Sequence, residues 1–420
     1  MLRLSPLSLR LLFAAFVALF SQIAQAESHY TLEKVVEISR HGVRPPSPDN
    51  RRAIEAGSAR TWASWLTRDG DLTGHGYTAA WLKGRYESQR YRQLGLIGNA
   101  CPNNAEFYLY ASPMQRTKMT AQALAEAAFP GCGVTVQAKK GPDPLFQYPA
   151  GKASKARAAA SRQEALAAMG GDLAAAQQRL QPQINALKRA VCQPAAPCPV
   201  FSEPWQLSVW SNGTIGIKGL DTLAAMAETL RLEWSENKPL SEVAFGKVHS
   251  AAEIAQLMPL LSYKYDYTND LPSSASRGAS TLMDQIAKAL RGEQQNALPD
   301  TRWLLIVAHD INISWLRTLL DFHWQQGLYP PGNIPPGGSL VFERWRDERQ
   351  QQFIRIYFQA QSLDQLRQLT PLDQQNPPLL TELHFNGCKT TEAGTLCPFT
   401  AAMQRIEKNI NRSVIVPDRY

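Results

Sequence analysis

Three short apolar segments, each ending abruptly in polar residues, place the strongest constraint on how this chain of 420 residues folds. Their length and their content of β-branched or aromatic residues predict buried strands. They are LEKVVEIS (32–39), AEFYLYAS (105–112) and RWLLIVAH (302–309).

Helix-forming sequence lies between and after the first of these segments. The stretch 73–95 begins at a threonine cap and ends at a glycine, and 115–131 stops at a proline and a glycine. Strands that alternate with helices predict an α/β fold, a three-layer sandwich with a mainly parallel central sheet. Two later segments, 338–345 and 353–360, predict a further pair of strands.

The middle of the chain has a different composition. Residues 152–190 are rich in Ala, Gln, Lys and Arg, among which are strong helix formers. Asn212-Gly213 predicts a hairpin, and an amphipathic helix is predicted over 222–234. We therefore expect a smaller helical cap domain, inserted into the α/β domain. The expected boundaries are 27–150 and 263–420 for the α/β domain and 151–262 for the cap.

The first 26 residues have the features of a secretory signal peptide. Arg3 and Arg10 precede or border a ten-residue apolar run at 11–20, and the small-residue motif AQA ends at residue 26. Ten apolar residues are too few to span a bilayer, which needs about 20. We expect cleavage before Glu27, a periplasmic location and no membrane contact afterwards.

The six cysteines are consistent with export, because an exported protein can keep disulfide bonds. Six cysteines allow 15 pairings, and proximity favours those that close the shortest loops. No CxxC motif occurs and no histidine lies at ligand spacing from a cysteine, so disulfides are expected rather than a metal, and no cofactor is implied. The favoured pairs are Cys101–Cys132, Cys192–Cys198 and Cys388–Cys397.

The formal net charge of +8 favours a negatively charged partner. The chain has no long basic tract and no RNA-binding signature, which argues against nucleic acid. A positive field instead helps to collect a small polyanion.

Charged residues gather where the three predicted strands end. Ligands of open α/β sheets bind outside the carboxyl ends of the strands, so these residues are expected to share one site. Arginine forks match phosphate oxygens and keep their charge. The residues are Arg40, His41 and Arg44 after the first strand, Arg116 after the second, and His309 and Asp310 after the third.

This set suits the transfer of a phosphoryl group. Neighbouring arginines lower the pKa of His41, and a neutral imidazole can attack phosphorus and carry the group covalently. The arginines would offset charge in the transition state. Asp310, when protonated in acid, can give a proton to the leaving oxygen.

The motif RHGVRPP (40–46), followed far downstream by His309-Asp310, resembles the histidine acid phosphatase family. DPLF (143–146), PPGGSLVFERW (335–345) and the closing Cys388–Cys397 segment look like the bacterial periplasmic phytases of that family. The resemblance implies a phosphoglycerate-mutase-like α/β domain with a helical cap over the cleft. It also implies His41 as nucleophile, Asp310 as proton donor, and Arg40, Arg44, Arg116 and His309 as phosphate ligands.

The expected function is therefore a monomeric periplasmic acid phosphatase that hydrolyses phytate through a phosphohistidine. Ser47, Met226 and Glu228 are candidate substrate contacts. One alternative is a glucose-1-phosphatase or broad sugar-phosphate phosphatase, which would share the same chemistry. A second is an exported anion-binding protein without turnover. A carboxylate beside bound phosphate, as in His309-Asp310, argues against such a binder.

Overall fold

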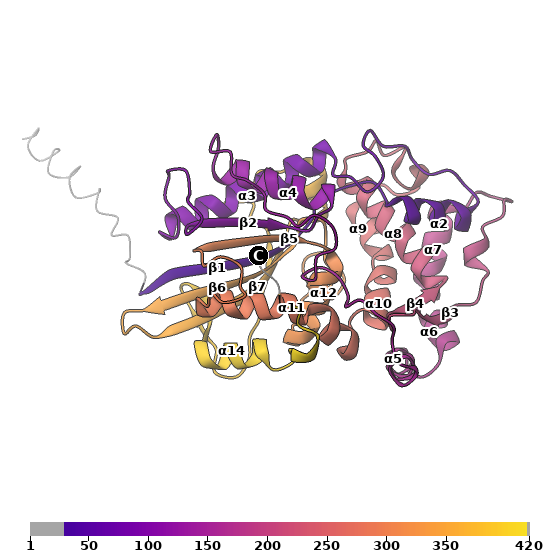
Figure 1. Cartoon of the computed structure of the whole chain (residues 1–420). Coiled ribbons are helices and arrows are strands. Elements are labelled where there is room, and N and C mark those ends of the chain that lie inside the picture. Colours follow the sequence, from indigo (N-terminus) through magenta and orange to yellow (C-terminus); the bar gives the residue numbers. More distant parts are fainter. Residues whose placement is uncertain (1–28, 418–420) are drawn as a thin grey trace, which may run out of the picture.

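The computed structural model describes residues 29–417, so the expected signal segment at 1–26 lies outside the described residues. Figure 1 shows a half in which a sheet is covered by helices on both faces, beside a half made mostly of helices. The α/β class predicted from the sequence is confirmed, and the fold is a three-layer arrangement around the sheet.

Eight of the described strands form one mixed sheet, in the order β2-β5-β1-β6-β7-β10-β9, with β8 beside β7. The three predicted buried strands form its parallel part, because β5 pairs in parallel with both β2 and β1. The later predicted pair is the antiparallel pair β6 and β7. The strands are β1 (Tyr30–Arg40), β2 (Phe107–Ala111), β5 (Trp303–Ala308), β6 (Ser339–Asp347), β7 (Gln352–Ala360), β8 (Leu379–Glu382), β9 (Lys389–Thr391) and β10 (Gly394–Pro398).

The continuous apolar run of β5 is explained by burial of both of its faces. Leu304 and Ile306 belong to the core under one face, whereas Leu305 and Val307 belong to the core under the other. Figure 1 shows α3 and α4 over one face and α11, α12 and α14 over the opposite face. The helices of this half are α3 (Gly74–Gln93), α4 (Gln115–Ala128), α11 (Pro272–Arg291), α12 (Asp310–Leu320) and α14 (Phe399–Glu407). A short helix after β7, α13 (Leu363–Gln368), packs against the helical half, because Leu363 belongs to the core there.

The helical half has its own apolar core. That core includes Ile54 and Trp62, which lie far before residue 151 in the sequence, and also Leu271, Tyr329 and Leu363, which lie after residue 262. We therefore propose that the segment around α2 belongs to this half together with 151–262. Its elements are α2 (Pro48–Ser58), α5 (Lys155–Ala168), α6 (Leu173–Arg179), α7 (Gln181–Val191), β3 (Gln206–Val209), β4 (Ile215–Lys218), α8 (Leu220–Ser235), α9 (Ala251–Leu257) and α10 (Pro259–Thr268). Three short 3₁₀ turns lie at Pro199–Phe201, Val243–Gly246 and Arg412–Val414.

The hairpin predicted at Asn212-Gly213 connects β3 to β4. Gly213 has a φ of +94°, a left-handed conformation that glycine adopts at little cost. The side chain of Asn212 accepts a hydrogen bond from the amide of Thr214 (3.1 Å), which stabilises the turn.

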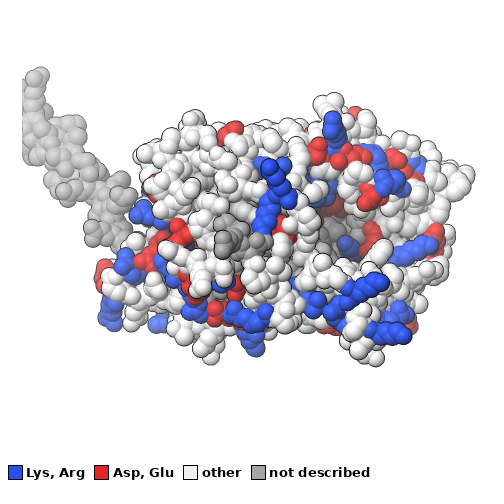
Figure 2. Space-filling model, viewed as in Figure 1, with Lys and Arg blue, Asp and Glu red and all other residues white. Residues whose placement is uncertain are grey.

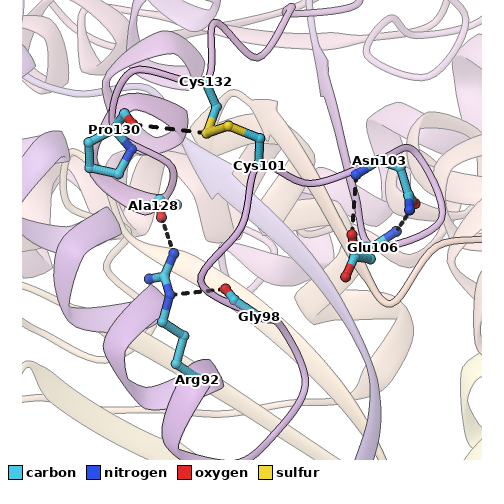
Figure 3. The surroundings of a disulfide bond; sticks show 8 residues. All are labelled: Arg92, Gly98, Cys101, Asn103, Glu106, Ala128, Pro130 and Cys132. Carbon is cyan, nitrogen blue, oxygen red and sulfur yellow. Dashed lines mark hydrogen bonds between the residues drawn. A yellow bond between two sulfur atoms is a disulfide. The ribbon is translucent and has the colours of Figure 1, made fainter.

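All three cysteine pairs that proximity favoured are disulfides: Cys101–Cys132, Cys192–Cys198 and Cys388–Cys397. Figure 3 shows the first of them, which joins the loop before β2 to the turn after α4. Arg92 supports the same region, because its guanidinium donates to the carbonyls of Gly98 and Ala128. The disulfide therefore closes a loop that side-chain contacts already order.

The surface carries charges of both signs. On the face drawn in Figure 2, Lys and Arg side chains are interspersed with Asp and Glu side chains. Such a face lacks the dominant basic stripe that nucleic acid binding uses. Within residues 29–417, no helix is long and apolar enough to cross a membrane.

Candidate active site

The polar residues of the three strand ends come together because β2, β5 and β1 are neighbours in the sheet. Arg40 is in register with Ala308, and Ala111 is in register with Val307. The chain then leaves each strand at the same edge, where α4 and α12 begin. The sequence predicted this edge as the site, and the structure places the candidate phosphate ligands there.

Arg40 is fully buried and fixed by several partners. It donates to the carbonyl of Ile334 (2.7 Å) and to the Glu228 carboxylate (2.6 Å), and it lies 3.1 Å from Oδ2 of Asp310. Burial opposes its charge, yet Asp310 and Glu228 raise its pKa above the ordinary value. Arg40 therefore stays charged at the base of the site.

His41 has the tautomer that a nucleophile requires. Its Nδ1 lies 2.9 Å from the carbonyl of Gly42, which can only accept, so Nδ1 carries the proton. Burial, followed by Arg44, Arg40 and Arg116, holds the pKa of His41 well below its usual range. The ring is therefore neutral, and Nε2 presents a lone pair.

Gly42 is required by close packing rather than by its backbone angles. A Cβ built at this position would lie 2.9 Å from Leu72 and 3.0 Å from the carbonyl oxygen of Gly76. The amide of Gly42 donates to the hydroxyl of Thr120 (3.0 Å), and the amide of Gly337 donates to the carbonyl of His41 (3.0 Å). These contacts hold the loop that carries the imidazole.

Arg44 and Arg116 complete a cluster of three arginines. Burial, with Arg116 and Arg40 next, lowers the pKa of Arg44 to about 10. The pKa of Arg116 is also lowered, first by burial and in part by Arg40. Within residues 29–417, the Nε atoms of all three arginines are buried without a hydrogen-bond partner. Buried donors in this number favour an anion with several oxygens.

His309 and Asp310 stand between the arginines and solvent. Nε2 of His309 lies 2.8 Å from the hydroxyl of Ser112, at the end of β2. Burial and Arg116 lower the pKa of His309 to about 3, so this ring is also neutral. Both residues are half-buried, whereas His41 is only 1% exposed, so the site opens on their side.

Asp310 is an ion-paired carboxylate. Burial would raise its pKa, but the charge of Arg40 outweighs this effect and holds the pKa well below the usual range. The negative charge of a phosphate among the arginines opposes that lowering. Asp310 is therefore expected to take up a proton only when an anionic substrate neutralises Arg40.

The helical half reaches this site through residues that local sequence patterns did not reveal. Tyr265 on α10 is buried near Asp310 and Arg40, and burial, followed by the charge of Asp310, raises its pKa well above the ordinary value. Arg231 on α8 pairs with Glu228 and donates to Asn333. Both are buried, and neither belongs to a motif. Only their position in the folded chain connects them to the strand ends.

The three candidate substrate contacts differ in exposure. Ser47 is half-buried, and its hydroxyl caps α2 by accepting from the amide of Asn50 (3.3 Å). Glu228 is 7% exposed and pairs with Arg40, and Met226 is fully buried in the core of the helical half. Among the residues that the structure describes, no group of His, Cys, Asp and Glu has the arrangement of a metal site.

The site and the fold define a class of phosphate-transfer enzyme. The family model of the histidine phosphatase superfamily (branch 2) matches residues 31–359, and the chain belongs to this superfamily. The family expected from the RHGVRPP and His309-Asp310 motifs is thus confirmed.

The chain is also similar to individual phytases and to a glucose-1-phosphatase. The structure of Klebsiella sp. ASR1 phytase is 48% identical in sequence, has a TM-score of 0.87, and is matched over 92% of this chain and 98% of that chain. Phytase AppA of Escherichia coli is 29% identical over 92% of this chain and 94% of its own length. A glucose-1-phosphatase of Salmonella typhimurium is 30% identical over 93% and 96% respectively.

Proposed function

We propose that the protein is an acid phosphomonoesterase of the periplasm that hydrolyses phytate, myo-inositol hexakisphosphate, as a monomer. One observation carries the proposal: a buried neutral imidazole, His41, lies among three arginines whose Nε atoms lack partners within the described residues. The likeness to the Klebsiella and Escherichia coli phytases supports phytate as the substrate. The signal motif at 1–26 supports the location.

In this proposal the scissile phosphate binds to Arg40, Arg44, Arg116 and His309. Nε2 of His41 attacks phosphorus as the bond to the leaving oxygen breaks, and Asp310 gives that oxygen its proton. The product alcohol leaves a phosphohistidine. Water, deprotonated by the Asp310 carboxylate, then attacks phosphorus, releases phosphate and restores His41.

Ser47 is the proposed contact for a second phosphate, because it is half-buried and follows the loop that carries His41. Met226 and Glu228 are buried. Glu228 would affect a substrate mainly through its bond to Arg40, and Met226 through the packing of α8.

A glucose-1-phosphatase is the second candidate, because the Salmonella enzyme of that name is 30% identical over most of the chain. The strand-end chemistry would be the same for both substrates. The deciding measurement is release of inorganic phosphate from phytate and from glucose 1-phosphate at about pH 5, where a carboxyl group near its reference pKa is partly protonated. Higher catalytic efficiency on phytate is expected. The opposite order would favour the second candidate.

The same assay tests the nucleophile. His41→Ala should lower turnover by about a thousand-fold or more, because no other group replaces the covalent step. His249→Ala is the matched control, because this histidine is exposed on the helical half and should leave turnover unchanged. An active His41→Ala variant with a native circular dichroism spectrum would overturn the mechanism. A wild-type protein that binds phosphate without turnover would indicate an anion-binding protein instead.

A further inference from the structure

We infer that Ser112 and Thr117 are positioning residues for phosphate binding: their two hydroxyl groups together fix the proton of His309 on Nε2. The inference rests on the proposed function, because it concerns a ligand of the scissile phosphate. It gives a role to two residues on either side of Arg116, in the segment that joins β2 to α4. The two hydroxyl groups and the His309 ring are here called the hydroxyl relay.

The hydroxyl of Thr117 directs its proton at the backbone. Its Oγ1 lies 2.8 Å from the carbonyl oxygen of Ser112 and 2.8 Å from that of Met114. A carbonyl oxygen can only accept a hydrogen bond, and a hydroxyl has a single proton. The proton of Thr117 is therefore used by these two carbonyls, and Oγ1 offers only lone pairs to any other neighbour.

The hydroxyl of Ser112 must consequently donate to Thr117. The two hydroxyl oxygens lie 2.9 Å apart, and the proton between them comes from Ser112 because that of Thr117 is already used. The same Ser112 oxygen lies 2.8 Å from Nε2 of His309. Since its one proton is committed to Thr117, Ser112 can only accept from the ring. Nε2 therefore carries the proton of the neutral imidazole.

The two histidines of the site thus carry their protons on opposite nitrogens. His41 is protonated on Nδ1, which faces the Gly42 carbonyl, and its Nε2 has the lone pair. His309 is protonated on Nε2. The two rings lie edge to face, with their centroids 5.6 Å apart and their planes at 67°. One ring therefore provides a nucleophile, and the neighbouring ring provides a hydrogen-bond donor.

Burial and backbone contacts keep the hydroxyl relay in place. Ser112 and Thr117 are almost completely buried, so water does not replace either hydroxyl. The amide of Ser112 donates to the carbonyl of Val307 in β5 (3.0 Å). On the other side, the amide of His309 donates to Oδ1 of Asn312 (3.1 Å), which is also buried. Both ends of the relay are therefore fixed to the sheet edge.

A donor at Nε2 suits a ligand of phosphate. A hydrogen bond from N–H to a charged phosphate oxygen is stronger than one to the uncharged Ser112 hydroxyl, so the proton can be shared with a bound substrate. The opposite tautomer would direct the lone pair of Nε2 at the anion and repel it. By excluding that tautomer, the hydroxyl relay keeps every molecule of the protein ready to bind.

Thr117→Val tests the relay, because it removes the acceptor that uses the Ser112 proton. Ser112 can then donate to Nε2, and His309 can adopt the opposite tautomer. Long-range proton–nitrogen NMR spectra of protein labelled at its histidine nitrogens show which nitrogen is protonated, and His309→Gln identifies the signal. Wild type should be protonated on Nε2, and Thr117→Val should be a mixture. Thr117→Ser restores a hydroxyl and should return the proton to Nε2.

Ser112→Ala is the second variant, because it leaves the backbone hydrogen bonds of the turn in place. It removes the acceptor of the Nε2 proton, so it should also give a mixture of tautomers. This variant keeps the inference testable if Thr117→Val does not fold, since the carbonyls near Thr117 retain their donor in Ser112→Ala.

The affinity for inorganic phosphate gives a second readout, measured by isothermal titration calorimetry. Thr117→Val should raise the Kd about fivefold, the effect of losing one hydrogen bond of ordinary strength. In a His309→Ala background the same substitution should cause no further rise, because no ring remains for the relay to orient. Thr78→Val removes an exposed hydroxyl of α3 and is the control, with an unchanged Kd.

Three results would each overturn the inference. They are a proton on Nδ1 of His309 in the wild-type protein, an unchanged tautomer in both Thr117→Val and Ser112→Ala, and a rise in Kd that persists without His309. The last result would show that Thr117 has only a structural role. A failure of the proposed function is a different result, because it would appear as a wild-type protein that releases no phosphate from any ester.

Discussion

Two clusters of buried charged residues lie along β1, and they differ in how their charges are balanced. The first, here called the paired cluster, consists of Glu37, Lys83, Glu87 and their hydrogen-bond partners. Lys83 donates to Glu37 (2.6 Å), Ser39 (3.1 Å) and Ser339 (2.6 Å). Burial opposes the charge of Lys83, but Glu37 and Glu87 raise its pKa above the ordinary value. The two carboxyl groups of this cluster share Lys83 as their cation.

The second group, here called the arginine cluster, consists of Arg40, Arg44 and Arg116 at the end of the same strand. Arg40 is paired with Glu228 and Asp310. Burial and then the neighbouring arginines lower the pKa of Arg44 and of the two neighbouring histidines, and burial with a contribution from Arg40 lowers that of Arg116. A fold gains no stability from such repulsion. The contrast indicates that the paired cluster stabilises the protein, whereas the arginine cluster is maintained for an anion.

The largest expected effect is on the free energy of unfolding, which a substitution in the paired cluster should lower far more than one in the arginine cluster. Lys83→Met should lower the free energy of unfolding by about 3–5 kcal/mol, because two buried carboxyl groups lose their cation. Arg116→Ala should cost far less stability, since it relieves repulsion, but it should lower phosphatase activity. Urea unfolding and phosphate release measure the two properties. Lys118→Met, at an exposed position of α4, is the control and should stay within about 0.5 kcal/mol of wild type.

A smaller effect is expected on the stabilisation of the protein by inorganic phosphate, which should depend on the arginine cluster and not on the paired cluster. Inorganic phosphate at about 100 times its Kd should stabilise the protein by about 2.7 kcal/mol, because the arginines gain a counter-ion in the folded state. Differential scanning fluorimetry checks this as a rise in Tm. Lys83→Met should keep the rise and Arg116→Ala should lose much of it. A similar rise in both variants would show that phosphate binds elsewhere.

The smallest effect concerns the pH dependence of the paired cluster. Burial, with Glu37 next, raises the pKa of Glu87 well above 4.5. The stability that this group contributes is therefore complete below about pH 4.5 and declines as pH rises toward the folded-state pKa, by at most about 1.4 kcal/mol per pH unit. Glu87→Gln mimics the protonated acid, so its stability should fall less than that of wild type between pH 5 and 6, by at most about 1.4 kcal/mol. Urea unfolding at several pH values measures the difference. Parallel pH profiles would contradict the raised pKa.

Much of the site could be predicted because its residues lie at the ends of recognisable strands. The apolar runs that became β1, β2 and β5 predicted where Arg40, Arg116 and His309 would meet. The position of Asp310 at a strand end did not predict its ion pair with Arg40. The pattern predicted a protonated acid at Asp310, whereas in the folded chain Asp310 is a carboxylate paired with Arg40. Its protonation therefore depends on the substrate.

The division of the chain into two halves was less visible in the sequence. The helix-rich composition of 152–190 indicated a separate helical region, but Ile54 and Trp62 join the same core from a segment next to the RHGVRPP motif. Their apolar character gave no sign of which core they enter. Likewise, Glu228 is an ordinary helical glutamate in the sequence, and its bond to Arg40 spans 188 positions.

The amino-acid sequence alone determined the α/β class, the disulfide pairs and the motif residues. Each of these depends on local pattern or on short loops. Only the tertiary structure decided that α8 and α10 bring Glu228 and Tyr265 to the strand ends. Contacts between distant segments depend on how whole helices pack, and local periodicity does not specify which faces meet. For this reason the chemistry of the strand ends could be predicted, and the partners from the helical half could not.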